Sequence, residues 1–258
     1  MGALTVTVEN KICVVTIDRP PANATNRAAY EEIRDVFYAI DRRDDVKVVI
    51  LTGAGKIFMA GNELGEFDEF QTPAKCTAYY DVIRNAYLAV KNCRYPVIGA
   101  VNGAAAGAGL AFAGCCDVLI AAEHTKFILS EIKVGVIGAD GFASLLVPEK
   151  VLRYMAFSGN PVTAEQVAAW GGIWKVVPRD EVLEEAKKLA AEFAENARHA
   201  LMFWKKSLNE NYDHRLAEKF NGNLQATIAY QDYHDFREAS AAFGEKRPPQ
   251  YDLSLIHI

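Results

Sequence analysis

Residues 96–111, with the sequence PVIGAVNGAAAGAGLA, constrain the fold more than any other stretch of the chain. A proline can open a strand, and the apolar run 97–101 is typical of a buried strand. Residues 103–110 contain only Gly, Ala and Leu, so the backbone itself becomes the accessible surface there. Good helix formers follow from Leu110 onwards. Strand, turn and helix N-terminus together predict either an anion site made of backbone N–H groups or a tight packing corner.

The composition is that of a globular protein with a substantial core. The 258 residues are 51% hydrophobic and 24% charged, which suits one large or two small domains. A net charge of −5 argues against nucleic acid or an anionic membrane as the main partner. No basic, apolar leader begins the chain, and Gly, Asn and Asp interrupt its longest apolar runs. We therefore expect a soluble cytoplasmic protein.

The cysteines are odd in number and lack the spacing of metal ligands. We expect them to be reduced thiols in the core, and we expect no metal site. The five residues are Cys13, Cys76, Cys93, Cys115 and Cys116.

Strand and helix patterns alternate along the first two thirds of the chain. The expected strands are 5–8, 12–17, 46–52, 97–101, 117–122 and 125–129. Helical spacing recurs after Asn26, a plausible N-cap, and again over residues 76–92. This alternation favours an α/β fold with mostly parallel strands. Residues 180–209 and 214–243 read as two helices, which predicts a C-terminal helical region.

Two glycine-bearing turns and one carboxyl group indicate a reaction site. The turns at residues 58–62 and 107–109 each lie between a strand and a helical segment, so each can aim an N–H at one oxygen. Glu131 follows apolar residues, where burial favours its protonated form. Together these features suit removal of a proton next to a thioester carbonyl. Without the turns, Glu131 would read as a surface residue or a helix cap.

The order of these segments resembles the enoyl-CoA hydratase/isomerase family, the crotonase superfamily, over nearly the whole chain. The segments that carry the resemblance are 14–24, 49–64, 100–109 and 232–247. The resemblance implies an α/β spiral of β-β-α repeats over residues 1–195, a helical trimerisation region over 196–248, and a tail over 249–258. It also implies a coenzyme A thioester as substrate, no further cofactor, and a homotrimer or a hexamer built as a dimer of trimers.

The resemblance assigns roles to individual positions. The N–H groups of Asn62 and Ala108 would form the oxyanion hole, and Glu131 would be the catalytic acid/base. Residues expected to contact coenzyme A are Arg19, Ala22, Lys56, Ala60 and Lys246. Aromatic residues expected to shape the acyl pocket, or else to pack in the core, are Phe70, Tyr79, Tyr80 and Tyr87.

One departure from the family pattern decides which reaction is expected. Hydratases of the family commonly carry two glutamates, and Ala111 stands where the first would be. The segment around Glu131 looks most like that of hydratase-lyases, so we expect hydratase/lyase chemistry through a thioester enolate. A double-bond isomerase is the next possibility. Because Ala111 could signal lost chemistry, a catalytically weak acyl-CoA-binding protein also stays open.

Asp140 is the second carboxylate of interest. Its place resembles an acidic position that activates water in family members that hydrolyse carbon–carbon bonds of β-diketones. A C–C bond hydrolase using Asp140 is therefore a further possibility. The structural alternative is that Asp140 is the N-cap of a helix through Phe142 and Leu146.

Overall fold

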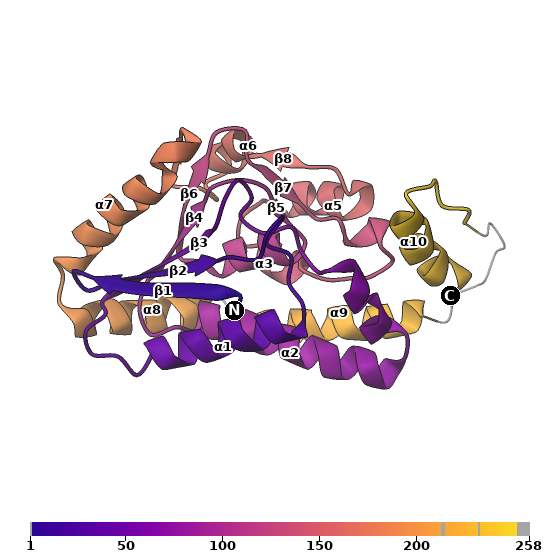
Figure 1. Cartoon of the computed structure of the whole chain (residues 1–258), viewed down its shortest axis with the longest axis horizontal. Helices are drawn as coiled ribbons and strands as arrows, with labels where there is room; N and C mark the ends of the chain where they lie inside the picture. Colours follow the sequence, from indigo (N-terminus) through magenta and orange to yellow (C-terminus); the bar gives the residue numbers. More distant parts are fainter. Residues whose placement is uncertain (1, 213–214, 232, 252–258) are drawn as a thin grey trace.

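The structure is a computed structural model that describes residues 2–212, 215–231 and 233–251 (Figure 1). The last part of the expected tail, residues 252–258, and Asp232 lie outside the described residues. The strands are β1 (Leu4–Glu9), β2 (Ile12–Ile17), β3 (Val48–Gly53), β4 (Val97–Val101), β5 (Ala105–Ala106), β6 (Val118–Ala122), β7 (Lys126–Ile128), β8 (Val162–Thr163) and β9 (Lys175–Val177).

Helices alternate with these strands and then continue alone after β9. The α-helices are α1 (Arg27–Ile40), α2 (Pro73–Lys91), α3 (Ala108–Cys115), α4 (Asp140–Ala143), α5 (Glu149–Ser158), α6 (Ala164–Ala169), α7 (Val182–Ala194), α8 (Arg198–Tyr212), α9 (Leu216–Tyr230) and α10 (His234–Glu245). Short 3-10 helices are η1 (Leu64–Phe70), η2 (Glu131–Lys133) and η3 (Arg179–Glu181).

A six-stranded sheet in the order β1-β2-β3-β4-β6-β9 forms the centre of the described structure. The β1–β2 hairpin is antiparallel, as its short turn predicts, and the other pairs are parallel. All six residues of β3 are buried, because helices cover both faces of this sheet. Val49 and Leu51 pack into the core beneath α1, α2 and α3, whereas Val48 and Ile50 pack against α7.

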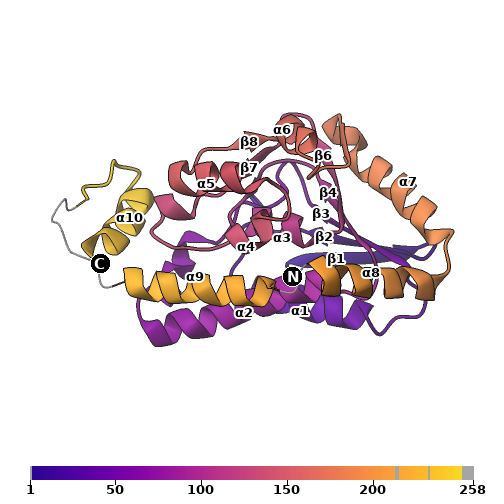
Figure 2. The same cartoon turned by 180° about the vertical axis from the view of Figure 1, so that it is seen from behind.

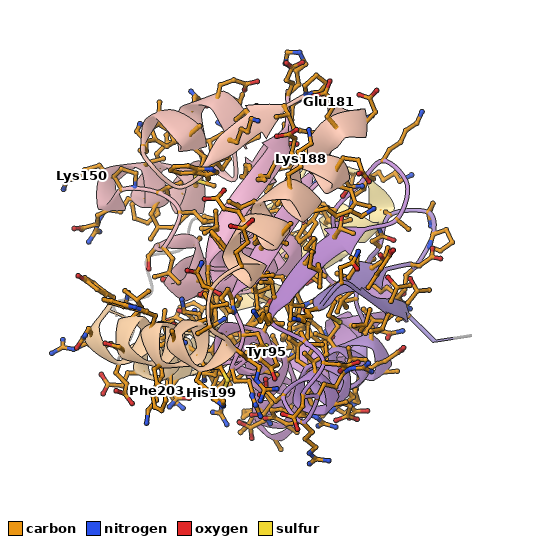
Figure 3. All side chains as sticks on the ribbon, turned by 90° about the vertical axis from the view of Figure 1, so that its left-hand side faces the viewer. Tyr95, Lys150, Glu181, Lys188, His199 and Phe203 are labelled. Atoms are coloured by element: carbon orange, nitrogen blue, oxygen red, sulfur yellow. The ribbon has the colours of Figure 1, made fainter. Side chains whose placement is uncertain are left out.

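The figures show how the helices are layered. Helices α1 and α2 run along one side of the sheet and α7 along the other (Figure 1). Seen from behind, α9 runs along α2, and the two helices are in contact (Figure 2). The end view shows Lys188 on the outer side of α7, Glu181 in η3 just before that helix, and Phe203 pointing outward from α8 (Figure 3). The larger of the two buried clusters therefore lies between the sheet and the α1–α2–α9 layer, and the smaller one lies between the sheet and α7.

A second sheet of three short strands, in the order β5-β7-β8, lies within the Gly/Ala-rich region and its neighbours. The sequence predicts a turn over residues 103–110 and gives no sign of β5. The two residues of β5 pair with β7 in parallel, through Ala105 with Phe127 and Ala106 with Ile128. This pairing fixes the start of α3 beside the segment that leads to Glu131.

The two long helices expected after residue 180 are in fact four, so this part of the prediction was wrong. The end of α7 is stabilised by a residue far away in the sequence. Lys47 Nζ donates to the carbonyls of Ala194 (2.6 Å) and Asn196 (2.7 Å), which lie between α7 and α8 or at the end of α7. A cation at a helix C-terminus satisfies its last carbonyl groups. The boundary at residues 195/196 stays a prediction.

Two other expectations concern what is absent. None of the helices among the described residues is long and apolar enough to cross a membrane. Within the same ranges, His, Cys, Asp and Glu side chains form no group that could hold a metal ion. All five cysteines are buried and free, as their number and spacing predict.

Candidate functional site

The two glycine-bearing turns lie side by side. Met59 and Ala105 form an isolated parallel bridge, and the N–H of Ala106 donates to the carbonyl of Met59 at 3.0 Å. A Cβ placed on Gly61 would lie 3.1 Å from the carbonyl oxygen of Ala106. The structure therefore brings together two segments that lie 46 residues apart in the sequence, counted from Met59 to Ala105.

The residues after the two glycines have backbone N–H groups that remain available. Gly61 and Gly107 adopt φ angles of +97° and +51°, which side-chain-bearing residues rarely adopt, and these angles reverse the chain just before Asn62 and Ala108. Within the described ranges, no protein acceptor is bonded to the N–H of Asn62 or to that of Ala108. Ala108 is also the first residue of α3, where N–H groups have no intrahelical partner.

Glu131 lies against the second turn. A Cβ on Gly107 would be 3.1 Å from Glu131 Oε1, so glycine is what allows this approach. The residue is half-buried, but its Oε2 is enclosed and has no hydrogen-bond partner among the described residues. Burial raises the pKa of the Glu131 carboxyl to about 8, and the negative charge of Asp140 acts in the same direction. Glu131 is thus a carboxyl group that holds its proton at neutral pH, as the apolar sequence around it predicts.

Asp140 and Glu131 line the same pocket, which has a volume of about 350 Å³. Asp140 Oδ1 accepts a hydrogen bond of 2.6 Å from Asn223 Nδ2 on α9. The alternative interpretation of Asp140 as an N-cap is wrong, because Ala139 precedes α4 and the helix has no side-chain cap. The other walls of the pocket are mostly apolar: Leu129, Ile132, Gly135, Val136, Ile137, Gly138, Ala156, Phe157 and Tyr230.

A smaller cavity of about 40 Å³ connects the predicted site residues. Asn62, Ala108 and Glu131 all line it, so the structure brings these three predicted residues together. Its remaining lining is largely aromatic and apolar: Phe70, Tyr80, Ile83, Tyr87, Val136, Gly138, Ala139 and Phe220. Of the four aromatic residues expected at an acyl pocket or in the core, Tyr79 is a core residue and does not line this cavity.

The Asn62 side chain is held by hydrogen bonds from Tyr30 and Thr25. Its Oδ1 accepts hydrogen bonds from Tyr30 Oη (2.5 Å) and Thr25 Oγ1 (3.3 Å). Thr25 is fully buried, and its backbone N–H donates to the carbonyl of Gly61 at 2.7 Å. The first turn is therefore anchored through both main-chain and side-chain atoms.

The residues expected to contact coenzyme A lie in three loops. The N–H of Ala60 donates to the carbonyl of Ala22 at 3.1 Å, which joins the loop after β2 to the loop after β3. Arg19 pairs with Glu63 at 2.5 Å, so its charge is partly compensated within the chain. Lys56 is exposed, and Lys246 is exposed at the C-terminal end of α10.

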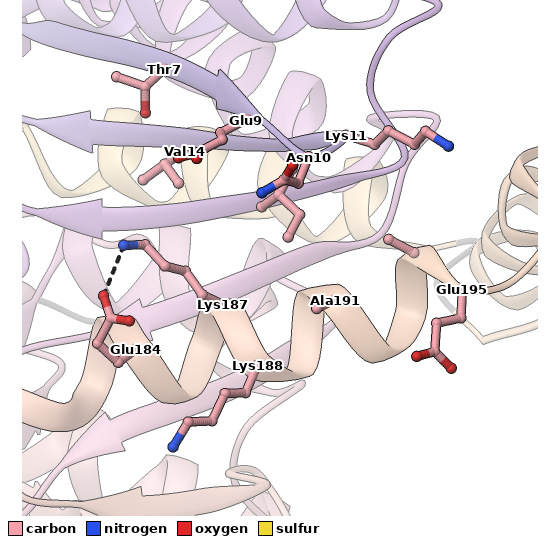
Figure 4. A pocket seen from close by; sticks show the side chains of 12 residues that line it. Thr7, Glu9, Asn10, Lys11, Val14, Glu184, Lys187, Lys188, Ala191 and Glu195 are labelled. Carbon is pink, nitrogen blue, oxygen red and sulfur yellow. Dashed lines mark hydrogen bonds and ion pairs between the residues drawn. The ribbon is translucent and has the colours of Figure 1, made fainter.

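A separate groove of about 690 Å³ lies between the β1–β2 hairpin and α7. Figure 4 shows Glu184 and Lys187 paired with each other along its edge, at 2.8 Å. Lys188, which also lines the groove, pairs with Glu185 at 2.5 Å. Neither Glu131 nor Asp140 is among the residues that line this groove.

Sequence reasoning missed the polar residues that α9 contributes. Asn223 bonds to Asp140, and Thr227, one turn later, bonds to the main chain of Ile137. Both side chains are buried. Their i, i+4 spacing on a helix with apolar neighbours is a signal that the sequence contained, because a polar residue on a buried face needs a partner.

The arrangement of strands and helices around these two turns matches that of crotonase-fold enoyl-CoA hydratases, which places the chain among the crotonase-fold enzymes. The chain matches the enoyl-CoA hydratase/isomerase family over residues 7–253 and belongs to that family. Both the family and the fold expected from the sequence are thereby confirmed.

Three similar proteins illustrate the range of the family. The chain is 32% identical to the (7aS)-7a-methyl-1,5-dioxo-2,3,5,6,7,7a-hexahydro-1H-indene-carboxyl-CoA hydrolase of Mycobacterium tuberculosis, covering 91% of this chain and 98% of the relative. It is 32% identical to the probable mitochondrial enoyl-CoA hydratase of Dictyostelium discoideum, covering 96% and 90%. Its structure resembles the crystal structure of an enoyl-CoA hydratase from Mycobacterium avium subsp. paratuberculosis with a TM-score of 0.85, 26% identity and coverage of 97% and 99%.

Proposed function

We propose that this chain is an acyl-CoA hydratase/lyase that acts through a thioester enolate. The observation that carries the proposal is the position of Glu131: a carboxyl group whose pKa burial raises to about 8, beside the turn that presents the N–H of Ala108. A proton donor next to two available amides suits a reaction in which negative charge develops on a thioester oxygen.

The role of each group follows from the chemistry of adding water to a 2-enoyl-CoA. Asp140 accepts a proton from water while the water oxygen bonds to C3. The electrons of the C2–C3 double bond move toward the thioester oxygen, where the N–H groups of Asn62 and Ala108 stabilise the charge. Glu131 then gives its proton to C2. Two carboxyl groups in different environments can divide the base and acid roles in this way.

In this proposal, Asp140 takes the role of the first glutamate of family hydratases, whose position is occupied by Ala111 in this chain. Ala111 lies inside α3 and is buried, whereas Asp140 lines the pocket of Glu131. A second carboxylate is therefore available from a different element of the fold.

A C–C bond hydrolase is the second candidate, since Asp140 lines the same pocket as Glu131. With a 3-oxoacyl-CoA, water activated by Asp140 would bond to C3, the C2–C3 bond would break, and Glu131 would protonate C2 of the thioester enolate. The similarity to a hydrolase of a dioxo carboxyl-CoA supports this candidate. The same groups serve both reactions, so the substrate decides between them.

Turnover in water labelled with oxygen-18 tests these candidates, using a panel of 2-enoyl-CoAs and cyclic 3-oxoacyl-CoAs. Label in a 3-hydroxyacyl-CoA would support the hydratase, and label in a new carboxylate would support the hydrolase. Movement of the double bond without label would overturn both in favour of an isomerase. Tight binding without any reaction would indicate an acyl-CoA-binding protein.

Assembly and coenzyme contacts belong to the same proposal. A homotrimer or hexamer, a cytoplasmic location, and coenzyme A contacts at Arg19, Ala22, Lys56, Ala60 and Lys246 stay predictions. Analytical ultracentrifugation tests the first, and the affinity of charge-neutral variants of the two lysines for coenzyme A tests the last.

A further inference from the structure

We propose that Asn223 on α9 is a positioning residue, which orients the Asp140 carboxylate toward the reacting water. The inference rests on the proposed function, because it presumes that Asp140 acts on that water. It assigns to α9 a part in the site beyond the coenzyme A contact at Lys246 that the resemblance of the sequence implies for the C-terminal helical region.

The first step of the argument is the hydrogen bond itself. Asn223 Nδ2 donates to Asp140 Oδ1 at 2.6 Å, across 83 residues of sequence. Asn223 is only 7% exposed, so water cannot readily replace its amide. In the parts of the chain that the structure describes, Asp140 Oδ2 has no protein partner, and Asp140 lines the pocket. One oxygen is thus fixed and the other is free to accept a proton.

The second step is that α9 also holds the loop that joins Glu131 to Asp140. Thr227 Oγ1 accepts from the N–H of Ile137 (3.0 Å) and donates to its carbonyl (3.1 Å). Tyr80 Oη, on α2, donates to the same carbonyl of Ile137 and lies 2.9 Å from Thr227 Oγ1. Since Asn223 and Thr227 are one helical turn apart, a single face of α9 fixes both the carboxylate and its loop.

The third step concerns the charges around Asp140. Glu131 approaches from η2 and would repel a second negative charge when ionised, and Tyr80 approaches from α2. Lys219 lies near the start of α9, but its Nζ donates to Ser144 Oγ at 3.2 Å. Among the described residues, it is therefore the side-chain amide of Asn223 that donates a hydrogen bond to the Asp140 carboxylate. A donor bonded to an ionised carboxylate stabilises that form.

The test compares Asn223→Leu with a matched substitution on the exposed side of the same helix, Asn221→Leu. Asn221 is exposed and accepts a hydrogen bond from Arg84 at 3.1 Å, and neither residue lines the pocket. The substrate is whichever 2-enoyl-CoA or 3-oxoacyl-CoA of the panel the parent converts fastest. We expect Asn223→Leu to lower kcat on the order of 10- to 100-fold with little change in KM. The acidic limb of its pH–rate profile should move to higher pH, while Asn221→Leu should match the parent.

Asn223→Asp keeps the shape and replaces the donor by an acceptor, so it serves if the leucine variant does not fold. We expect it to lose at least as much kcat near neutral pH, and to recover part of it at lower pH, where the new carboxyl group can donate again. A structural role alone would lower thermal stability without moving the pH profile.

Asp140→Asn separates failure of this inference from failure of the proposed function. If Asp140→Asn turns over like the parent, the role of Asp140 is wrong, and this inference with it. If Asp140→Asn is inactive while both Asn223 variants keep the parent's kcat and pH profile, only the positioning role of Asn223 is overturned. Adding Asn223→Leu to Asp140→Asn should cause no further loss.

Discussion

Gly107 and Glu131 are in such close contact that a methyl group on Gly107 would lie 3.1 Å from Glu131 Oε1. The turn before α3 and the acid of the site therefore depend on each other. Replacing either residue changes the surroundings of the other, which makes this contact a direct test of the site.

Gly107→Ala should impair turnover more than stability. The substitution strains a φ of +51° and crowds Oε1, at a cost of about 1–3 kcal/mol in the free energy of unfolding. We expect kcat to fall at least on the order of tenfold, because the acid is displaced. Gly55→Ala is the control: its φ is +71°, yet nothing lies within 4 Å of the added methyl. If both variants lose stability but neither loses turnover, the contact has no role in the reaction.

Glu131→Gln should abolish proton transfer while leaving the pocket intact. We expect deuterium exchange at the α-carbon of acyl-CoAs in deuterated water to fall on the order of 10²- to 10⁴-fold. The affinity for a saturated acyl-CoA should stay near that of the parent, since glutamine keeps the shape of the side chain. Normal exchange in the variant would show that another group moves the proton.

The rate should fall as the pH rises through about 8, because Glu131 is active as a protonated acid and burial raises its pKa to about 8. A pH–rate profile of kcat/KM in the free enzyme measures this limb directly. A rate that instead rises through the same pH would mean that Glu131 acts first as a base, which is the behaviour expected of an isomerase.

The free energy of unfolding should depend on pH through the same group. Between the ordinary value of 4.5 and about 8, the folded chain holds a proton on Glu131 that the unfolded chain has released. Raising the pH across this window therefore destabilises the parent. Glu131→Gln lacks this ionisation, so its advantage over the parent should grow with pH, to on the order of a few kcal/mol. Urea denaturation at several pH values checks the trend, and a constant difference would contradict it.

The ion pair of Lys205 and Asp117 should be needed for stability. Lys205 Nζ lies 2.7 Å from Asp117 Oδ2, its side chain is 3% exposed, and the same oxygen accepts from the N–H of Val97 at 2.7 Å. Removing the cation takes one partner from the Asp117 carboxylate, which is 24% exposed, so Lys205→Met should cost about 1–3 kcal/mol. Lys206→Met removes an exposed pair with Glu210 and should cost less than about 1 kcal/mol. Similar losses in both variants would refute the difference in burial as the cause.

The fold was largely predictable where the signal is local. The hairpin, the Asn26 cap, which accepts from the N–H of Ala29 at 3.0 Å, and the buried strands all follow from neighbouring residues. The two turns and the burial of Glu131 could also be read from short segments. Strand β5 could not, because alanine has no strand preference and its pairing with β7 is set by residues further along the chain.

The parts of the site that escaped prediction depend on contacts between distant residues. Asp140 itself was a candidate site residue, with a helix cap as the alternative, but the sequence did not indicate which group its carboxylate bonds to. Its partner Asn223 lies 83 residues later, and nothing near either residue announces the other. The end of α7 could not be predicted for the same reason, because Lys47, which bonds to its last carbonyl group, precedes it by more than one hundred residues.

The hydrogen bonds from α9 also set the order in which the site can form during synthesis. Both turns and Glu131 leave the ribosome well before Asn223 and Thr227, and domains tend to fold as their segments emerge. A growing chain thus carries an unfinished pocket until its last helices have docked. Nascent or prematurely ended chains would contain both glycine-bearing turns, but they would lack the hydrogen bonds from α9 that fix Asp140 and its loop.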